Sequence, residues 1–339
     1  MAVSLVSTGV TFPDSSTQIT AATGFGFKNR IINGAMVIDQ RNAGASVTNV
    51  SAPASFAYSV DRWGYWATQA SKFTLQQSST APAGFTTSLK ITSSSAYTVL
   101  STDYFTIGQN IEGFNVADFG YGAAGAATVT ISFWVQSSLT GTFGGALSNG
   151  STNRSYAFSY TISAANTWEQ KTITVAGDTT GTWNKTNSTG LILTLGLGVG
   201  SSATGATGSW AGAWYASANS AVNVVSTNGA TFYITGVQLE KGSTATSFDY
   251  RPYGTELALC QRYYWTLNGR VIYLASYGAA SLYITNVYFP VAMRATPTIT
   301  NNLAGSPTVP GTSISTLGFG IYNSTAGSSF DAATATSEL

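Results

Sequence analysis

The 339-residue chain contains no histidine, and only 8% of its residues are charged, with 14 Lys and Arg against 13 Asp and Glu. Without an imidazole, the chain cannot form a Ser-His-Asp triad, a Cys-His dyad or a zinc site with histidine ligands. Soluble domains carry roughly 25% charged residues, so this chain has few of the lysines and arginines that bind polyanions. The sequence therefore excludes much of hydrolase chemistry and argues against nucleic acid as a partner.

Cysteine and long apolar runs are also scarce. The single cysteine, Cys260, excludes a disulfide within the chain and a metal site of four thiolates, and we expect it to be a small buried hydrophobe. Residues 1–10 lack the basic start and apolar stretch of a secretory signal, and no run reaches the roughly 18 apolar residues that span a bilayer. We therefore expect a soluble protein without membrane insertion, and we predict neither a cofactor nor a bound metal.

What the chain does contain favours β-structure, because 13% of its residues are aromatic and 36 are glycine. In residues 128–136, the apolar side chains from Val129 to Val135 alternate with Trp134, Gln136 and smaller polar residues, which we expect on a mostly solvent-facing side. The same alternation recurs in residues 155–162, 191–199 and 231–240. Each segment is typical of a strand with one buried face.

These strands are separated by loops rich in Gly, Ser and Asn, which predicts an all-β fold with a jelly-roll-like antiparallel β-sandwich. A shift of the alternation at Gly236 predicts a β-bulge. Residues 254–264 predict one short helix, capped by Thr255 and with Glu256 near its positive end. We predict a four-part chain: an N-terminal attachment and oligomerisation segment (1–27), the sandwich (28–250), a connecting helix (251–264) and a small C-terminal β domain (265–339).

Several short motifs frame nearly the whole region from residue 28 to 264. They are residues 11–14 (TFPD) with 17–18, 29–34 (NRIING) with 39–41, 58–63 (YSVDRW), 232–240 (FYITGVQLE), 250–252 (YRP) and 257–264 (LALCQRYY). Together they resemble a family of virion proteins of tailed bacteriophages, usually described as tail fibre or tail appendage proteins. Residues 289–297 (FPVAMRATP) are similar to a segment that follows the helix in other phage fibre proteins.

This resemblance implies a non-enzymatic, homotrimeric virion protein with a sandwich similar to carbohydrate-binding modules. Its N-terminal segment would bind other virion proteins, and its C-terminal part would face outward to a host-surface glycan or protein receptor. The resemblance carries over no catalytic residue, so the function rests on analogy at this point. A capsid-bound head fibre or decoration protein is one alternative, and a tail-spike polysaccharide depolymerase is another.

Candidate ligand-binding residues follow from the chemistry of sugars, which need exposed aromatic rings with a few polar groups nearby. The candidates in Gly-rich loops are Trp183, Trp210, Trp214 and Tyr215, and those in the C-terminal domain are Tyr277 and Tyr322. The alternative for each loop residue is an anchor of the loop or a contact between subunits. An exposed tip would make the two C-terminal tyrosines the better candidates for receptor contact.

Other residues are expected to have structural roles. The DRW motif consists of Asp61, Arg62 and Trp63. We predict that its acid and base form a buried pair that orients a core tryptophan, although a sugar-binding role is the alternative. Glu240 is predicted to pair with Arg251 or Arg262 and so to lock the sandwich to the C-terminal domain.

Two further expectations concern oligomerisation and metal binding. In a trimer, the short helix would bring copies of Leu257 and Cys260 together near the three-fold axis. A structural calcium site is an alternative use of four carboxylates, although these lack the spacing of an EF-hand. They are Asp103, Glu112, Asp118 and Asp249.

Overall fold

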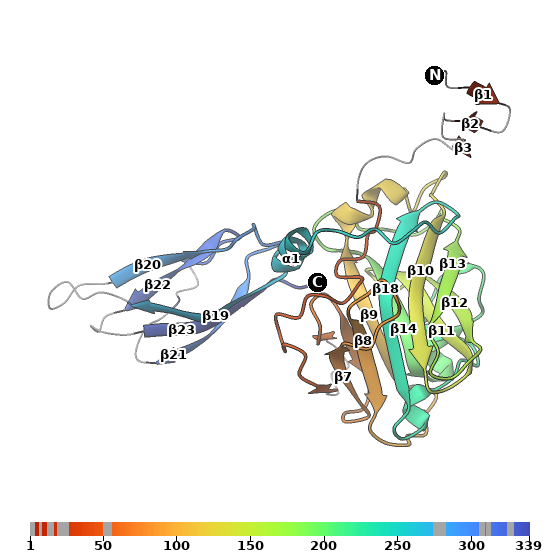
Figure 1. The fold of residues 1–339 in the computed structure, drawn as a ribbon, viewed down its shortest axis with the longest axis horizontal. Coiled ribbons are helices and arrows are strands. Elements are labelled where there is room, and N and C mark those ends of the chain that lie inside the picture. The colour runs from red at the N-terminus through yellow and green to blue at the C-terminus, as the bar shows by residue number, and fades with distance from the viewer. Residues whose placement is uncertain are drawn as a thin grey trace.

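The computed structural model describes residues 4–6, 9–11, 17–18, 27–49, 56–273, 283–304, 309, 313–323 and 329–339. The described chain forms a large two-layer β-sandwich and two small C-terminal sheets, with helix α1 between them (Figure 1). The predicted all-β fold, an antiparallel sandwich with one short helix, is confirmed.

One layer of the sandwich is a six-stranded sheet in the order β13-β10-β18-β8-β7-β4. Its strands are β4 (Val47–Thr48), β7 (Phe73–Ser78), β8 (Ser88–Ser93), β10 (Val129–Ser137), β13 (Glu169–Val175) and β18 (Thr231–Lys241). The pairing of β10 with β18 shifts beside Phe133, where Gly236 has φ +61°. The predicted bulge at Gly236 is confirmed, and it falls at a residue without a Cβ because left-handed φ strains other side chains.

The second layer is a seven-stranded sheet in the order β16-β12-β11-β14-β9-β6-β5. Its strands are β5 (Ala57–Tyr58), β6 (Gly64–Ala67), β9 (Tyr104–Glu112), β11 (Gly141–Asn149), β12 (Ser155–Ile162), β14 (Thr189–Val199) and β16 (Trp210–Ala211). The loops between strands hold the pair β15 (Thr204–Gly205) and β17 (Ser217–Ala218) and the 3-10 turns η1 (Gly113–Asn115), η2 (Ala117–Phe119), η3 (Ser201–Ala203) and η4 (Val224–Ser226).

The main core lies between the two layers. In β10 the predicted inward residues Val129, Ile131 and Phe133 are buried, and Trp134 on the other side is half-buried. The solvent-facing side is only partly as predicted, because Thr130 and Ser132 are also buried. Buried rows in β12 and β14 oppose them from the second layer. Each fully buried aliphatic or aromatic side chain contributes about 1.5–3 kcal/mol, which gives the sandwich its stability without disulfides.

Helix α1 spans Tyr253–Gln261, so the helix predicted at 254–264 is present but ends three residues earlier. Thr255 is not its cap, because the helix begins two residues before Thr255 and has no side-chain cap hydrogen bond. The helix ends where Arg262 turns to Glu112 of β9, with 2.7 Å between the guanidinium nitrogen and the carboxylate oxygen. A tertiary ion pair thus ties the end of the helix to β9.

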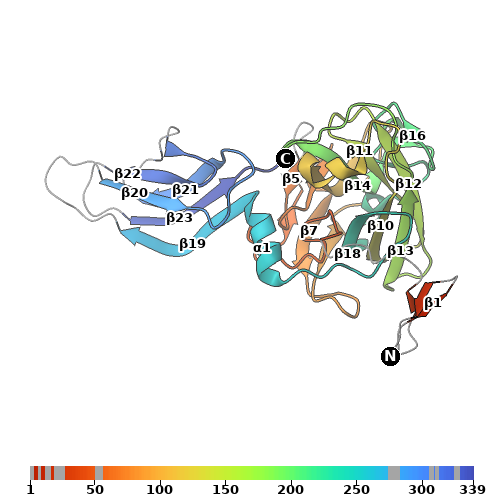
Figure 2. The ribbon, with the colours of Figure 1, turned by 90° about the horizontal axis from the view of Figure 1, so that it is seen from above.

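The C-terminal sheets extend away from the sandwich on the far side of α1 (Figures 1 and 2). They are β19-β23-β21 and β20-β22, with the bounds β19 (Tyr264–Tyr273), β20 (Tyr283–Tyr288), β21 (Thr298–Ala304), β22 (Gly318–Asn323) and β23 (Ser329–Thr336). Trp265, Phe289 and Phe319 build a separate small core there.

A small N-terminal sheet consists of β1 (Ser4–Val6), β2 (Gly9–Thr11) and β3 (Thr17–Gln18). The helical segments in the described part of the chain are too short to cross a membrane.

Candidate functional site

The DRW motif lies buried where the sandwich meets α1. Its members are Asp61, Arg62 and Trp63, each at most 1% exposed. The indole N–H donates to the carbonyl of Asn33 at 3.0 Å. The predicted burial is confirmed, but the acid and base bind other residues: Arg62 pairs with Glu338, and Asp61 lies 3.8 Å from the Nε of Arg41. The motif therefore joins the sandwich to the C-terminal residues and offers no ring face to a sugar.

Burial controls ionisation at this junction. Burial raises the pKa of Asp61 to about 6, although hydrogen bonds from Gln40 and the charge of Arg41 oppose the shift. Burial also raises the pKa of Tyr263 to about 12, and its hydroxyl donates to Glu112 at 2.5 Å. The ionisation of Asp61 and Tyr263 is therefore coupled to folding, because folding removes both groups from solvent.

The predicted pairing of Glu240 is wrong. Glu240 accepts hydrogen bonds from the backbone N–H and the hydroxyl of Thr246 at 2.9 and 2.7 Å, because the segment after β18 folds back over this carboxylate. The partners of the two arginines are Glu256 for Arg251 at 3.3 Å and Glu112 for Arg262 at 2.7 Å. The second pair still ties the helix to the sandwich.

The four carboxylates considered for calcium do not converge. They are Asp103, Glu112, Asp118 and Asp249, and each binds its own protein donors. Hydrogen bonds from the Leu100 N–H and the Thr68 hydroxyl outweigh desolvation and hold the pKa of Asp103 below its ordinary value. No group of three or more Cys, Asp or Glu suited to a metal occurs among the described residues, so these four carboxylates do not form a common calcium site.

Cys260 is buried at 1% exposure, as expected, in a small cluster with Ile32, Ile38 and Tyr263. Leu257 packs at the edge of the same cluster. In this conformation Cys260 has no exposed surface with which to meet copies of itself, whereas Leu257 is only partly covered.

Two of the loop tryptophans pack on one another. Trp183 and Trp210 lie 5.3 Å apart with nearly perpendicular rings, and Tyr121 contacts both. Their indole N–H groups donate to the carbonyls of Thr180 and Ala176. At 8% exposure, Trp183 leaves no ring face for a sugar, so it anchors the loop instead of binding a ligand.

The remaining aromatic candidates are also engaged or lie outside the described residues. Trp214 packs edge-on against Tyr104 of β9, with 5.2 Å between ring centroids. The ring of Tyr215 lies so close to Gly205 that a Cβ there would be 2.3 Å from it. Tyr277 lies outside the described residues, as does the side chain of Tyr322, whose backbone belongs to β22.

The structure instead gathers aromatic side chains on the outer side of the six-stranded sheet. We call this surface the aromatic face, and it consists of Trp134, Trp168 and Tyr233 with Lys90, Gln136 and Gln76, all half-buried. The strand pairing places Gln136, Tyr233, Lys90 and Gln76 in one row across β10, β18, β8 and β7. Trp134 lies two residues from Gln136 and therefore on the same side.

Contacts within the aromatic face fix its rings. Trp168 lies 6.2 Å from Tyr233 between ring centroids, and the ammonium of Lys90 lies 5.7 Å from the Tyr233 ring. Two buried oxygens on this side of the sheet have no hydrogen-bond partner, the Oε1 of Gln136 and the Oγ1 of Thr235. The half-buried rings, with the amides and the ammonium group beside them, are groups that a polyhydroxylated ligand can use.

The sequence alone predicted only part of the aromatic face. The alternation in residues 128–136 placed Trp134 and Gln136 on the solvent side. Trp168 and Tyr233 come from other segments, and their approach depends on the strand order, which alternation does not reveal.

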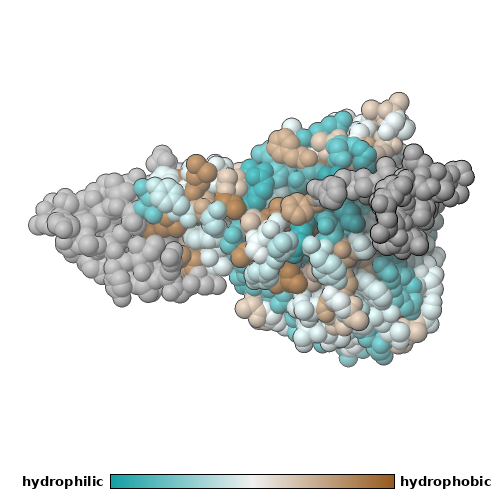
Figure 3. Space-filling view, turned by 45° about the horizontal axis from the view of Figure 1, so that its top comes forward, coloured by the Kyte–Doolittle hydropathy of each residue, from teal (hydrophilic) through white to brown (hydrophobic). Residues whose placement is uncertain are grey.

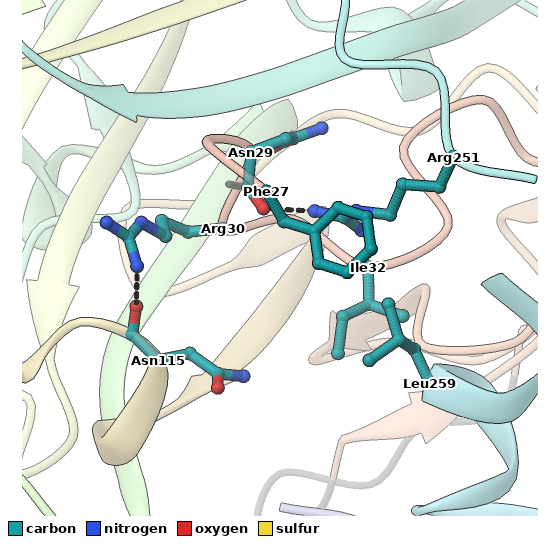
Figure 4. Close-up of a pocket in the computed structure, with 7 residues that line it drawn as sticks. All are labelled: Phe27, Asn29, Arg30, Ile32, Asn115, Arg251 and Leu259. Carbon is teal, nitrogen blue, oxygen red and sulfur yellow. Dashed lines mark hydrogen bonds between the residues drawn. The ribbon is translucent and has the colours of Figure 1, made fainter. Parts of the chain in front are cut away.

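A pocket of about 160 Å³ lies near the helix, between segments that are far apart in sequence (Figure 4). It is lined by Phe27, Asn29, Arg30, Ile32, Asn115, Arg251 and Leu259. The guanidinium of Arg30 donates to the carbonyl of Asn115 at 3.2 Å, and that of Arg251 donates to the carbonyl of Asn29. Because both guanidinium groups donate to backbone carbonyls of the protein itself, these arginines join chain segments.

The surface around this junction is mixed in character. Figure 3 shows hydrophobic side chains gathered where the sandwich meets the C-terminal sheets, among hydrophilic ones on the sandwich. Phe27 and Tyr253 are among the exposed large hydrophobic residues, at 57% and 63%.

No protein-family model matches the chain, and no curated protein matches it either. Among solved structures, the chain is similar to a putative sugar binding protein from Bacteroides thetaiotaomicron, at 12% identity over 63% of this chain and 100% of the other, with a TM-score of 0.38. It is also similar to a family 11 carbohydrate-binding module from Clostridium thermocellum, at 12% identity over 60% and 100%, with a TM-score of 0.32.

A third similar structure is the enzymatically active domain of tailspike protein 4 from bacteriophage CBA120, at 11% identity with a TM-score of 0.33. The match covers 53% of this chain but only 19% of the tailspike domain. At this level of similarity, the function has to be inferred from the chain's own residues.

Proposed function

We propose that this protein is a structural and adhesive component of a bacteriophage virion, which attaches to a host-surface glycan through the aromatic face. The aromatic face carries the glycan-binding part of the proposal, because it combines half-buried rings with polar side chains on one side of the six-stranded sheet. The virion assignment is supported by the sequence motifs between residues 11 and 264.

The geometry of the aromatic face suits a pyranose. The apolar C–H side of a sugar ring packs on an aromatic ring, and its hydroxyls donate to acceptors beside that ring. Gln136, Gln76 and Lys90 supply half-buried polar groups beside the rings.

The proposal includes a homotrimeric appendage on the tail, facing the host exterior, whose N-terminal segment contacts other virion proteins and which has no catalytic activity of its own. Light scattering of the purified protein tests the trimer, and antibody labelling of particles distinguishes a tail fibre from a head fibre or decoration protein. Release of reducing sugar from a bound polysaccharide would contradict the non-enzymatic part and favour the depolymerase.

Binding of the full chain to a panel of purified bacterial capsular and O-antigen polysaccharides tests the glycan proposal. We expect saturable binding to at least one polysaccharide and at least tenfold weaker binding by a Trp134→Ala variant. Trp214→Ala is the matched control, because Trp214 is also half-buried but lies on the other sheet's side. Equal losses in both variants, or no binding by the intact chain, would contradict the assignment.

A variant without residues 265–339 would not test glycan binding alone. It removes Glu338, the partner of the buried Arg62, and so perturbs the sandwich itself. Point variants on the aromatic face avoid this effect because they leave the junction intact.

A further inference from the structure

A second pocket, of about 190 Å³, lies beside the start of α1 and is distinct from the aromatic face. Its wall is formed by three aromatic residues, Phe85, Phe248 and Tyr250, and its charged lining residues are Asp249, Arg251 and Glu256. We call it the helix-side pocket. None of its aromatic residues belongs to the aromatic face or to the candidates expected from the sequence.

The aromatic wall is held rigidly in place. The three ring centroids lie 4.8–5.5 Å apart. The hydroxyl of Tyr250 donates to the carbonyl of Gly84 at 2.8 Å, yet Tyr250 remains 59% exposed. Phe85 rests on the bulge, where a Cβ on Gly236 would lie 2.6 Å from its ring. A fixed, exposed ring needs no ordering when a ligand packs against it.

The helix-side pocket has two acidic side chains and one basic side chain among its lining residues. Arg251 pairs with Glu256 at 3.3 Å, which balances one acid with the one base. One oxygen of Asp249 accepts the backbone N–H groups of Lys28 and Asn29 at 3.0 and 3.2 Å. None of the ion pairs among the described residues involves Asp249. The pocket therefore contains a carboxylate without a cationic partner.

A partly desolvated carboxylate next to aromatic rings favours a cation over a neutral or anionic ligand. The carboxylate attracts the cation directly, and the negative faces of the rings add a further attraction. A pocket of about 190 Å³ suits one terminal group and not a polymer.

We propose that the helix-side pocket binds an ammonium group on a small apolar frame, with Asp249 as the counter-charge and Tyr250 as the ring against which the cation packs. Two sources share this chemistry, a methylated ammonium such as choline and the primary ammonium of an amino sugar. The site is separate from the aromatic face and does not depend on glycan binding there.

Saturation-transfer NMR on the full chain tests this proposal with four probes. Choline is compared with 3,3-dimethylbutanol, its neutral carbon analogue, and glucosamine is compared with N-acetylglucosamine, in which the amine carries no charge. We expect choline, glucosamine or both to bind at least tenfold more tightly than the neutral counterpart. Choline alone would identify a methylated ammonium as the ligand, and glucosamine alone an amino sugar.

Variants link this binding to the helix-side pocket. Asp249→Asn removes the charge but keeps an oxygen for the two backbone N–H groups, and we expect at least fivefold weaker binding. Tyr250→Ala should reduce binding similarly, whereas Tyr250→Phe should retain most of it. Asp118→Asn is the control for loss of a negative charge elsewhere, and thermal unfolding of each variant checks that it is folded.

Three results would overturn the proposal: no binding of either cation, equal binding of the neutral analogues, or equal effects of Asp249→Asn and Asp118→Asn. Trp134→Ala should leave this binding unchanged. A negative result for cation binding in the helix-side pocket is therefore distinguishable from a negative result for glycan binding on the aromatic face.

Discussion

Both sheets of the sandwich bury their inner sides against each other, but their outer sides differ. On the seven-stranded sheet, outward positions of the central strand β11 are small, and the chain itself covers them: Ala146 is fully buried, and Ser217 lies against Gly144. On the six-stranded sheet, Trp134 and Gln136 face outward and remain half-buried. At these places the chain covers the outer side of one sheet and leaves that of the other available to a ligand.

The covered side is closed at two places. The segment with β15 and β17 packs over β11 and β14, where the hydroxyl of Thr194 donates to the carbonyls of Ala146 and Ala216. Near β5 and β9, the carbonyl of Leu339 accepts hydrogen bonds from Asn110 and Tyr58 at 2.9 and 3.1 Å. The closure is therefore part of the fold, and breaking it should affect stability, whereas changes on the open side should affect binding.

The largest effect is expected from Glu338→Ala. This change leaves Arg62, only 1% exposed, without its carboxylate and also removes the partner of Arg41. Breaking a buried pair from one side costs about 3–5 kcal/mol, which urea unfolding measures. Asp118→Ala is the control, because its ion pairs are exposed and should contribute about 1 kcal/mol or less. Similar losses in both variants would contradict the role of the C-terminal residues.

The second effect concerns pH. The pKa of Asp61 is about 6 in the folded chain against 3.8 for the ordinary group. Below about pH 3 the group is protonated in both states, and as pH rises toward 6 the unfolded chain loses its proton first. Folding stability should therefore fall by about 3 kcal/mol between pH 3 and 7 relative to an Asp61→Asn variant. Urea unfolding across this range tests it, and parallel profiles for the two proteins would contradict it.

Gly144→Ala should have an intermediate effect on the covered side. The added Cβ would lie 2.3 Å from the Ser217 Oγ and 2.7 Å from the backbone nitrogen of Ala218. Overpacking of this kind costs about 1–3 kcal/mol. Gly254→Ala is the matched control, because nothing lies within 4 Å of its added Cβ, and it should change stability by less than about 1 kcal/mol. Equal thermal unfolding temperatures for the two variants would contradict the tight packing around Gly144.

The smallest effect on stability is expected on the open side, from Gln136→Leu. This change removes a buried oxygen that has no partner, so stability should stay equal or rise by up to about 1 kcal/mol. Binding to the selected polysaccharide should weaken about fivefold, because the half-buried amide beside the rings is lost. A variant that is clearly destabilised but binds normally would show that Gln136 serves the fold.

Much of the sandwich was predictable from sequence because a period of two maps directly onto burial. Residues 128–136 and the bulge at Gly236 are examples. The buried ion pairs were not, because Arg62 and Glu338 lie 276 residues apart and meet only through the C-terminal sheets. The aromatic face was missed because Trp168 and Tyr233 become neighbours through the strand order. Loop composition suggested that Trp183 is exposed, but packing against Trp210 buries it.

The most direct test of this account is hydroxyl-radical footprinting of the full chain with and without the polysaccharide selected by binding. We predict protection of Trp134, Trp168 and Tyr233 on the six-stranded sheet, with Trp210 and Trp214 unchanged. Protection of Trp210 and Trp214 while the aromatic face stays reactive would contradict the central claim that the open sheet binds the glycan.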